Sequence, residues 1–195
     1  AASDIEFKFP FGFKELEGIH SRTDFDLSQH QEFSGKKLQY FDNELNESYT
    51  PCVVETSIGL DRMFLAIFSN SLVNEELDNN TSRVVLKLPI FLAPYKAAIL
   101  PLVKKDGLSE LSREIYNKLR LSLNITFDEK DAVGRRYRRQ DAIGTPFCIT
   151  VDHQSKEDNS VTVRNRDSMF QERIPIIELE KYLLDRVSFK SHINK

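Results

Sequence analysis

Residues 95–103 read YKAAILPLV, a nearly uninterrupted apolar run. A strand of this composition is buried on both faces, which is typical of a central position in a sheet. Pro101 falls near the end of the run, where a missing backbone hydrogen bond is tolerable. Apolar residues then recur at helical spacing and predict a helix over about residues 109–121, at Leu108, Leu111, Ile115 and Leu119. A buried strand followed by an amphipathic helix predicts an α/β fold.

The sequence after this helix continues the alternation of strands and helices. Short apolar runs predict four further strands, at 125–127, 147–151, 161–166 and 173–176. A polar turn at 155–159 separates two of them, so they form a hairpin and the sheet is mixed. Two further helices are predicted, one at 133–144 that ends at Gly144 and one marked by Leu179, Tyr182, Leu183 and Val187.

The first part of the sequence is richer in strand patterns. Apolar residues alternate with polar ones at residues 5–9, and a turn signal follows at 10–12. In residues 13–19 (FKELEGI), a regular strand would place Glu15 and Glu17 on one face. Carboxylates beside apolar neighbours are unusual on a core-facing surface, so we expect this face to be exposed or to have a binding role.

A glycine-bearing turn joins a strand to a helix further along this part. Residues 52–57 (CVVETS) predict a strand on which Glu55 and Ser57 face the same way. The helix is predicted from Leu60, Phe64, Ile67 and Phe68, which places Arg62 in its first turn. The amino end of a helix favours anions. Arg62 is therefore either solvated or paired with a nearby carboxylate, or it receives an anionic ligand such as phosphate together with the helix start.

Charge is distributed unevenly, although the net charge of the chain is only −3. Residues 1–80 hold six basic and 15 acidic residues, whereas residues 81–195 hold 21 basic and 15 acidic residues. The polar stretch at 74–82 (NEELDNNTS) has no apolar period and is typical of a linker. We therefore expect two domains, at 1–80 and 81–195. The basic second half leaves nucleic-acid binding open, although the near-neutral whole does not favour it.

The densest cluster of charge surrounds Tyr137 in the second half, at Arg135, Arg136, Arg138 and Arg139. Guanidinium groups pair with phosphates, and an adjacent aromatic ring can stack on an unpaired base. A short run of charge is more often a solvated helix face, and Asp141 can neutralise part of it. The cluster alone leaves both interpretations open.

Several classes of site find no support in the sequence. The motifs GxxxxGK[ST], GxGxxG, HExxH and GxSxG do not occur, and the four histidines lack metal-ligand spacing, so no metal-binding residue is assigned. Cys52 and Cys148 support neither a zinc ribbon nor a disulfide framework, which favours a reducing, cytoplasmic setting. No run approaches the roughly 18 residues that cross a bilayer, so we expect no membrane partner.

Four longer stretches together resemble one known family. Residues 9–27 (FPFGFKELEGIHSRTDFDL), with His30 following, resemble a signature stretch of class II, homodimeric glycyl-tRNA synthetases. Residues 51–62 (PCVVETSIGLDR) resemble the part of that family that contains class II motif 3. Residues 134–149 (GRRYRRQDAIGTPFCI) and 161–169 (VTVRNRDSM) resemble its carboxy-terminal anticodon-binding domain. The matches keep the order of the family over almost the whole chain.

The resemblance implies both a fold and an activity. The fold is an α/β one, with part of a class II antiparallel-sheet catalytic region at 1–80 and a mixed-sheet anticodon-binding domain at 81–195. The activity is that of a glycine–tRNA ligase, which uses ATP and magnesium to attach glycine to its tRNA through glycyl-adenylate. The full-length enzymes of this family are homodimers.

The resemblance also implies roles for individual residues. Glu15 matches the glutamate that binds the ammonium of glycine, whereas Glu17 matches no position with an expected role. Glu55 and Ser57 match the pair that helps to hold glycine, and Arg62 matches the motif 3 arginine that contacts the terminal phosphate of ATP. The arginine cluster at 135–139 is implied to lie near tRNA, although the resemblance assigns no contact with a base.

The sequence departs from the family pattern because nothing in it resembles class II motifs 1 and 2. It matches a fragment that begins partway through the catalytic domain, so we expect this polypeptide alone to be inactive in aminoacylation. The alternative is a non-catalytic, synthetase-like accessory protein that binds nucleic acid. Such a relative would be expected to lose the ligand residues, and their presence here favours a true synthetase.

Overall fold

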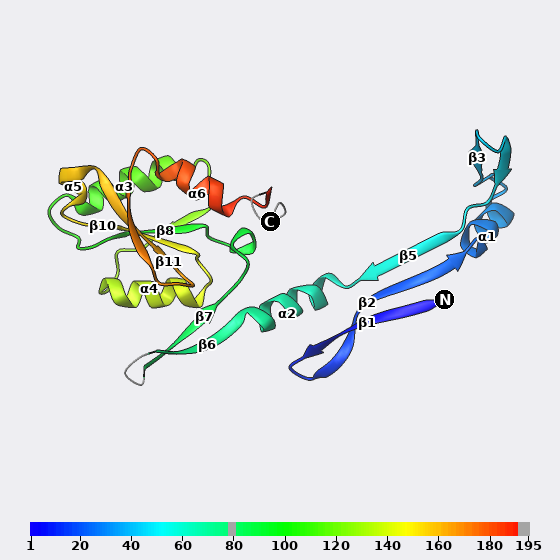
Figure 1. Ribbon diagram of the computed structural model, residues 1–195, viewed down its shortest axis with the longest axis horizontal. Helices are drawn as coiled ribbons and strands as arrows, with labels where there is room; N and C mark the ends of the chain where they lie inside the picture. The colour runs from blue at the N-terminus through cyan, green and yellow to red at the C-terminus, as the bar shows by residue number, and fades with distance from the viewer. Residues whose placement is uncertain (78–80, 191–195) are drawn as a thin grey trace. The chain divides into compact units, whose positions relative to one another are not determined.

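The computed structural model describes residues 1–77 and 81–190 and divides into two compact units. The first unit is Ala1–Ser69 and the second is Asn70–Lys195 (Figure 1). The division therefore lies about ten residues before the boundary that the sequence predicted near residue 80. Within the described residues, the structure has no helix that is both long enough and apolar enough to span a membrane.

An antiparallel sheet of three strands, in the order β1-β2-β5, forms the frame of the first unit. β1 (Ala2–Phe9) and β2 (Gly12–Thr23) form a hairpin, and β5 (Val53–Ile58) pairs with the other edge of β2. The hairpin turn depends on Gly12, whose φ of +107° is strained for other residues. The alternating pattern of the sequence predicted these strands and this turn.

The chain between β2 and β5 forms α1 (Phe25–Ser34) and a small hairpin of β3 (Tyr40–Asp42) and β4 (Glu47–Tyr49). After β5, the chain passes through Gly59 into α2 (Leu60–Ser71). The predicted order of strand, glycine turn and helix is therefore confirmed.

A mixed sheet of five strands, in the order β12-β11-β10-β8-β9, forms the centre of the second unit. β10 is parallel to β8, which is parallel to β9, whereas β11 is antiparallel to both of its neighbours. The mixed sheet that the sequence predicted is confirmed. Its strands are β8 (Ala97–Pro101), β9 (Ile125–Phe127), β10 (Phe147–Val151), β11 (Ser160–Asn165) and β12 (Gln171–Pro175).

Helices cover both faces of this sheet (Figure 1). α3 (Leu108–Leu119) and α6 (Leu179–Val187) pack on one face, against alternate residues of β8, β10 and β11. α4 (Val133–Ala142) packs on the other face, where Tyr137 contacts the buried residues Ala98, Leu100 and Cys148. Two short helical turns complete the unit, η1 (Ile90–Leu92) and α5 (Ser155–Asp158), the second within the predicted polar turn.

The described residues of the stretch at 74–82, which the sequence predicted to be a linker, lie in the two strands of a hairpin instead. β6 (Leu72–Leu77) pairs antiparallel with β7 (Thr81–Leu86), and residues 78–80 lie outside the described residues. The linker prediction is therefore wrong for the described part of this stretch. Because β6 pairs with β7, residues 70–77 belong to the second unit. The boundary between the units therefore lies near residue 70.

Buried charges fix this hairpin to the rest of the second unit. The guanidinium of Arg83 in β7 donates to Glu75 of β6 (Nε to Oε2, 2.6 Å) and to Asp141 of α4 (Nη1 to Oδ2, 2.9 Å). Asp141, none of whose side chain is exposed, also accepts two hydrogen bonds from Arg164 of β11 (2.8 and 3.1 Å). Buried charges are tolerated only when they are paired in this way.

Arg166 fixes the carboxy end of β7 through hydrogen bonds to backbone oxygens. Its guanidinium donates to the carbonyl oxygens of Leu86 (3.0 Å), Leu88 (2.8 Å) and Gly144 (2.9 Å). Gly144 has a φ of +83°, and a Cβ at this position would lie 3.0 Å from the oxygen of Leu86. The close approach of the two segments therefore requires glycine at position 144.

We expect Asp141→Asn to destabilise the second unit by about 3–5 kcal/mol, because the change leaves Arg83 and Arg164 buried without a counter-charge. The rate at which the Cys148 thiol is alkylated measures how often the second unit opens. Cys148 is fully buried, and burial raises the pKa of its thiol to about 12, so alkylation at neutral pH requires the unit to open. In a Cys52→Ser background, which removes the exposed cysteine, labelling of Cys148 should accelerate by about 100-fold or more.

The matched control is Asp185→Asn, which makes the same chemical change at an exposed position of α6 that forms no ion pair within the described residues. Its labelling rate should equal that of the parent protein. Equal rates for the Asp141 and Asp185 variants would show that the buried ion pairs do not hold the second unit together.

Candidate functional site

One irregularity in β2 decides which side chains share a face of the first sheet. Ile5 of β1 lies opposite Glu17, but the next residue, Glu6, lies opposite Glu15, so Leu16 is an extra residue in β2. Residues directly opposite each other point to the same face, and side chains alternate along a regular strand. A bulge of one residue reverses that alternation. Glu15 and Glu17 therefore point to opposite faces.

The prediction that Glu15 and Glu17 share a face is wrong for this reason, because it assumed an unbroken strand. Glu17 lies opposite Ile5 on one side and Ile58 on the other, in a row with apolar neighbours. Glu15 lies opposite Glu6, on the face that carries more polar side chains.

The two predicted residues of β5 lie on this polar face. Ser57 lies opposite Gly18 of β2, and Glu55 lies opposite His20. Because Gly18 and His20 are two residues apart on β2, both pairs point the same way.

The register between β1 and β2 shows that Glu15 points to the same face. Asp4 lies opposite Gly18, and Glu6, two residues further along β1, lies opposite Glu15. Asp4 and Glu6 share a face of β1, so Glu15 and Ser57 share a face of the sheet. The register thus brings Glu15, Glu55 and Ser57 together on one face, which we call the carboxylate face.

Two side chains of the carboxylate face were not singled out from the sequence. The imidazole of His20 lies above Gly18, where a Cβ would approach it to 3.1 Å, and its Nε2 lies 3.8 Å from Oδ1 of Asp4. The only available sign was the glycine at position 18 of a strand, since glycine within a strand often marks the close approach of another group.

One basic group partly balances these acids. The guanidinium of Arg22 donates to both oxygens of Asp26 (2.7 and 2.8 Å), and its Nε lies 3.7 Å from Oε2 of Glu55. The hydrogen bond from Arg22 lowers the pKa of Asp26 below its ordinary value. Among the described residues, the carboxylate of Glu55 has only this longer contact, so it remains available for a further hydrogen bond.

Arg62 lies in the first turn of α2, as the sequence predicted. Its guanidinium donates to the backbone oxygen of Glu15 (Nη1 to O, 2.5 Å), and its side chain lies over Gly59. No ion pair of Arg62 with Asp61 or another acid occurs within the described residues. The structure therefore links Arg62 directly to the strand that carries Glu15, and its charge has no carboxylate partner among the described residues.

The described residues of this unit do not form a metal site. No group of three or more histidine, cysteine, aspartate or glutamate side chains is placed to hold an ion in residues 1–77 or 81–190. A divalent ion such as magnesium prefers several oxygen ligands, which Glu15 and Glu55 on their own do not supply. We therefore assign no chemical step to a metal held by these residues.

The predicted arginine cluster lies on α4 of the second unit, and its members have different environments. Arg136 is buried, and its guanidinium donates to three backbone oxygens, those of Pro101 (2.6 Å), Asp128 (3.2 Å) and Leu102 (3.2 Å). Burial lowers the pKa of Arg136. Its contacts fix α4 to the strand ends and place its charge out of reach of RNA.

The other three arginines are exposed. Arg139 donates to Asp128 (2.8 Å) and Asp131 (2.7 Å), and its hydrogen bond lowers the pKa of Asp131. Arg135 and Arg138 form no ion pair with an acid within the described residues. The cluster therefore offers two guanidinium groups that are both exposed and free of carboxylates.

Comparison with known families finds a match within the second unit. Residues 96–186 match the family described as "Anticodon binding domain", which spans the sheet, α3, α4 and most of α6. The matched residues therefore include Arg135 and Arg138, whereas the β6–β7 hairpin lies before them.

Similarity to single proteins extends over nearly the whole chain. The sequence is 54% identical over 189 residues to "Glycine--tRNA ligase" of Clostridium beijerinckii and 51% identical over 189 residues to that of Geobacillus thermodenitrificans. It is 50% identical over 185 residues to that of Borrelia hermsii. The matches cover 94–97% of this chain, and the chain spans about 40% of the length of these relatives.

A solved structure shows the same fold. The crystal structure titled as the RNA binding domain of threonyl-tRNA synthetase from Cryptosporidium parvum superposes with a TM-score of 0.67. The match covers 95% of this chain and 42% of the other chain at 18% sequence identity. At this level of identity the comparison establishes the fold.

We expect Arg136→Met to destabilise the second unit by about 2–4 kcal/mol, because it leaves three backbone oxygens without their donor. Arg138→Met removes an exposed charge from the same helix and should change the free energy of unfolding by less than about 0.5 kcal/mol. Alkylation of Cys148 again measures domain opening. Similar labelling rates for both variants would contradict the structural role of Arg136.

Proposed function

We propose that this chain is part of a glycine–tRNA ligase, in which the carboxylate face contributes to the binding of glycine, α2 contributes to the binding of ATP, and the anticodon binding domain binds the tRNA for glycine. The observation that carries the proposal is the β2 bulge, which joins Glu15, Glu55 and Ser57 on one face beside Arg62. Similarity to glycine–tRNA ligases over nearly the whole chain supports it.

The carboxylate face suits the recognition of an amino acid that has no side chain. Such a substrate offers only its ammonium and carboxylate groups and its small size. Glu15 and Glu55 are exposed carboxylates that can accept charge-assisted hydrogen bonds from an ammonium group. The hydroxyl of Ser57, in the neighbouring row of β5, adds a donor and an acceptor.

Arg62 suits contact with a phosphate of ATP. It combines an unpaired guanidinium with a position in the first turn of α2, where the helix dipole also favours an anion. Its hydrogen bond to the backbone of Glu15 places this charge next to the carboxylate face. Glycine and ATP would thus be held by adjacent groups of one sheet and one helix.

The proposed reaction has two steps. A carboxylate oxygen of glycine attacks the α-phosphorus of ATP, and the bond to the leaving pyrophosphate breaks to give glycyl-adenylate. A hydroxyl of the terminal adenosine of tRNA then attacks the glycyl carbonyl carbon and releases AMP. The residues described here bind and orient substrates, which is a principal source of rate enhancement in such transfers.

The proposal extends to the setting of the reaction. Magnesium accompanies ATP, although no described residue is assigned to it. We infer that the full-length enzyme is a homodimer and acts in the cytoplasm, where its tRNA substrate is found. These parts of the proposal rest on the resemblance to class II glycyl-tRNA synthetases.

We expect the 195-residue polypeptide to show no glycine-dependent exchange of pyrophosphate into ATP, because nothing in its sequence resembles motif 2. In a full-length ligase that contains this chain, Glu55→Gln should raise the KM for glycine about 10- to 100-fold, as expected for the loss of a hydrogen bond between charged groups. The KM for ATP should remain within about twofold of the parent value. Pyrophosphate exchange measures both constants.

Glu17→Gln is the matched control, because Glu17 lies on the opposite face of the same strand. It should leave the KM for glycine unchanged. Equal effects of the two substitutions would contradict the assignment of glycine to the carboxylate face, and exchange by the 195-residue polypeptide would contradict the need for motif 2.

We also expect the 195-residue polypeptide to bind a glycine tRNA transcript through Arg135 and Arg138. Replacing both by glutamine should reduce the slope of log Kd against log salt concentration by about 1.4–1.8, since each phosphate contact contributes roughly 0.7–0.9. Filter binding between 50 and 200 mM salt measures this slope.

The control replaces Lys181 and Lys190 by glutamine, which removes two exposed charges elsewhere in the second unit. An equal loss of slope in both double variants would show that Arg135 and Arg138 contribute only to the net charge. Transcripts with substituted anticodons test specificity, and equal affinity for all of them would rule out recognition of the anticodon.

A further inference from the structure

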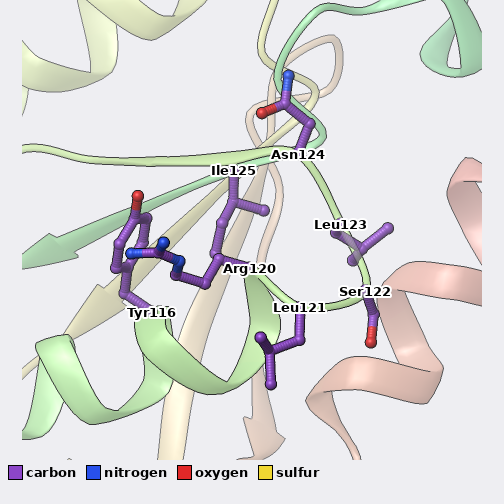
Figure 2. A pocket seen from close by; sticks show the side chains of 7 residues that line it. All are labelled: Tyr116, Arg120, Leu121, Ser122, Leu123, Asn124 and Ile125. Atoms are coloured by element: carbon purple, nitrogen blue, oxygen red, sulfur yellow. The ribbon is translucent and has the colours of Figure 1, made fainter.

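A pocket opens where α3 ends and the chain turns into β9 (Figure 2). It is lined by Tyr116 of the last turn of α3, by Arg120, which directly follows the helix, and by residues 121–125 of the connecting loop and the first residue of β9. None of these residues was singled out from the sequence. The pocket lies within the anticodon binding domain, but it does not involve α4 and its two exposed arginines.

Arg120 and Tyr116 form a flat, charged wall of this pocket. The guanidinium of Arg120 lies over the ring of Tyr116, with 5.6 Å between its central carbon and the ring centroid (Figure 2). Arg120 is exposed and forms no ion pair with an acid within the described residues, unlike Arg113 on the same helix, which pairs with Glu129. A guanidinium stacked on an aromatic ring is the kind of surface on which an unpaired base stacks.

The ring of Tyr116 is held in place by packing against neighbouring side chains. Tyr116 packs edge-on against Phe127 of β9, with 5.9 Å between ring centroids, and the guanidinium of Arg113 lies 4.4 Å from the centroid of Phe127. The stacked side chains are thus supported from below by the edge strand of the sheet, so little conformational entropy is lost when a ligand binds.

The loop on the other side is also held in place. The amide of Asn124 donates to the backbone oxygen of Pro94 (2.7 Å), and the hydroxyl of Ser122 donates to Glu180 of α6. Leu121, between them and Arg120, has 85% of its surface exposed and extends into solvent at the rim. An exposed leucine beside a stacked arginine and tyrosine gives the pocket an apolar edge for a flat ring.

The position of the pocket at the carboxy end of α3 decides which chemical group it suits. Carbonyl oxygens with a partial negative charge gather at this end of a helix and disfavour a phosphate. They favour a ring that carries N–H donors, while Arg120 can donate to ring acceptors. We propose that this pocket binds one unpaired base of an RNA strand, which extends the tRNA binding of the proposed function to a second surface of the domain.

The first test asks which part of a nucleotide the pocket binds. In NMR titrations of the 195-residue polypeptide, cytidine and guanosine 5′-monophosphates should shift the side-chain signals of Tyr116 and Asn124, whereas inorganic phosphate should not. Equal shifts with phosphate would make the pocket an anion site and overturn the proposal.

The second test asks whether the base is part of an RNA strand. An unstructured RNA octamer should bind more tightly than a mononucleotide and more tightly than an octamer of the same charge that lacks bases. Binding of the mononucleotide as tight as that of the octamer would assign the pocket to a free nucleotide. Equal binding of the octamer without bases would show that the protein contacts only the phosphates.

Arg120→Gln and Lys118→Gln form a matched pair, because both remove one exposed charge at the carboxy end of α3 and only Arg120 lines the pocket. Arg120→Gln should weaken octamer binding about tenfold, as expected for a lost stacking contact, and Lys118→Gln less than about twofold. Equal losses would overturn the proposal. Alkylation of Cys148 confirms that both variants remain folded.

These tests do not depend on the glycine tRNA. If the octamer binds in the pocket but no glycine tRNA transcript is bound, the proposed function fails and the pocket stands. If the transcript binds through Arg135 and Arg138 but Arg120→Gln has no effect on either RNA, the pocket proposal fails alone.

Discussion

Asp141 of α4 lies between the guanidinium groups of Arg83 and Arg164, and the arrangement of the second unit depends on these ion pairs. They join a helix, a strand of the central sheet and the hairpin that precedes the matched family. A buried charge is costly unless it is paired. Removing any one of these elements would therefore leave a buried charge on another element without its partner. The hairpin is therefore a structural part of the second unit.

The first unit depends on a smaller feature, the extra residue Leu16 in β2. Without it, the alternation of the strand would turn Glu15 away from Glu55 and Ser57. A bulge of this kind reverses the alternation of side chains from that point along the strand, while the pairing with the neighbouring strand continues on both sides of it. The proposed binding site thus needs a local defect in a regular sheet, whereas the second unit needs buried charges between distant segments.

The sequence predicted those parts of the structure that follow from local periodicity. The run at 95–103 and the later apolar runs became the strands of a mixed sheet, since burial on both faces leaves a continuous apolar pattern. The pairing of β6 with β7 was missed because its stability comes from partners such as Asp141, which is 58 residues from Arg83. The bulge was missed because no residue pattern distinguishes an extra Leu16 from a regular strand position.

The buried face of α4, which includes Arg136, could also have been predicted from the sequence. Arg136, Tyr137, Gln140 and Asp141 recur at the spacing of one helix face, which is the buried face of α4 even though it is polar. Apolar contacts would let such a helix rotate at little cost, but hydrogen bonds are directional. The bonds of Arg136 and Asp141 therefore fix the rotation of α4 about its axis. The same bonds determine that Arg135 and Arg138 face solvent, so the buried polar face sets the geometry of the exposed one.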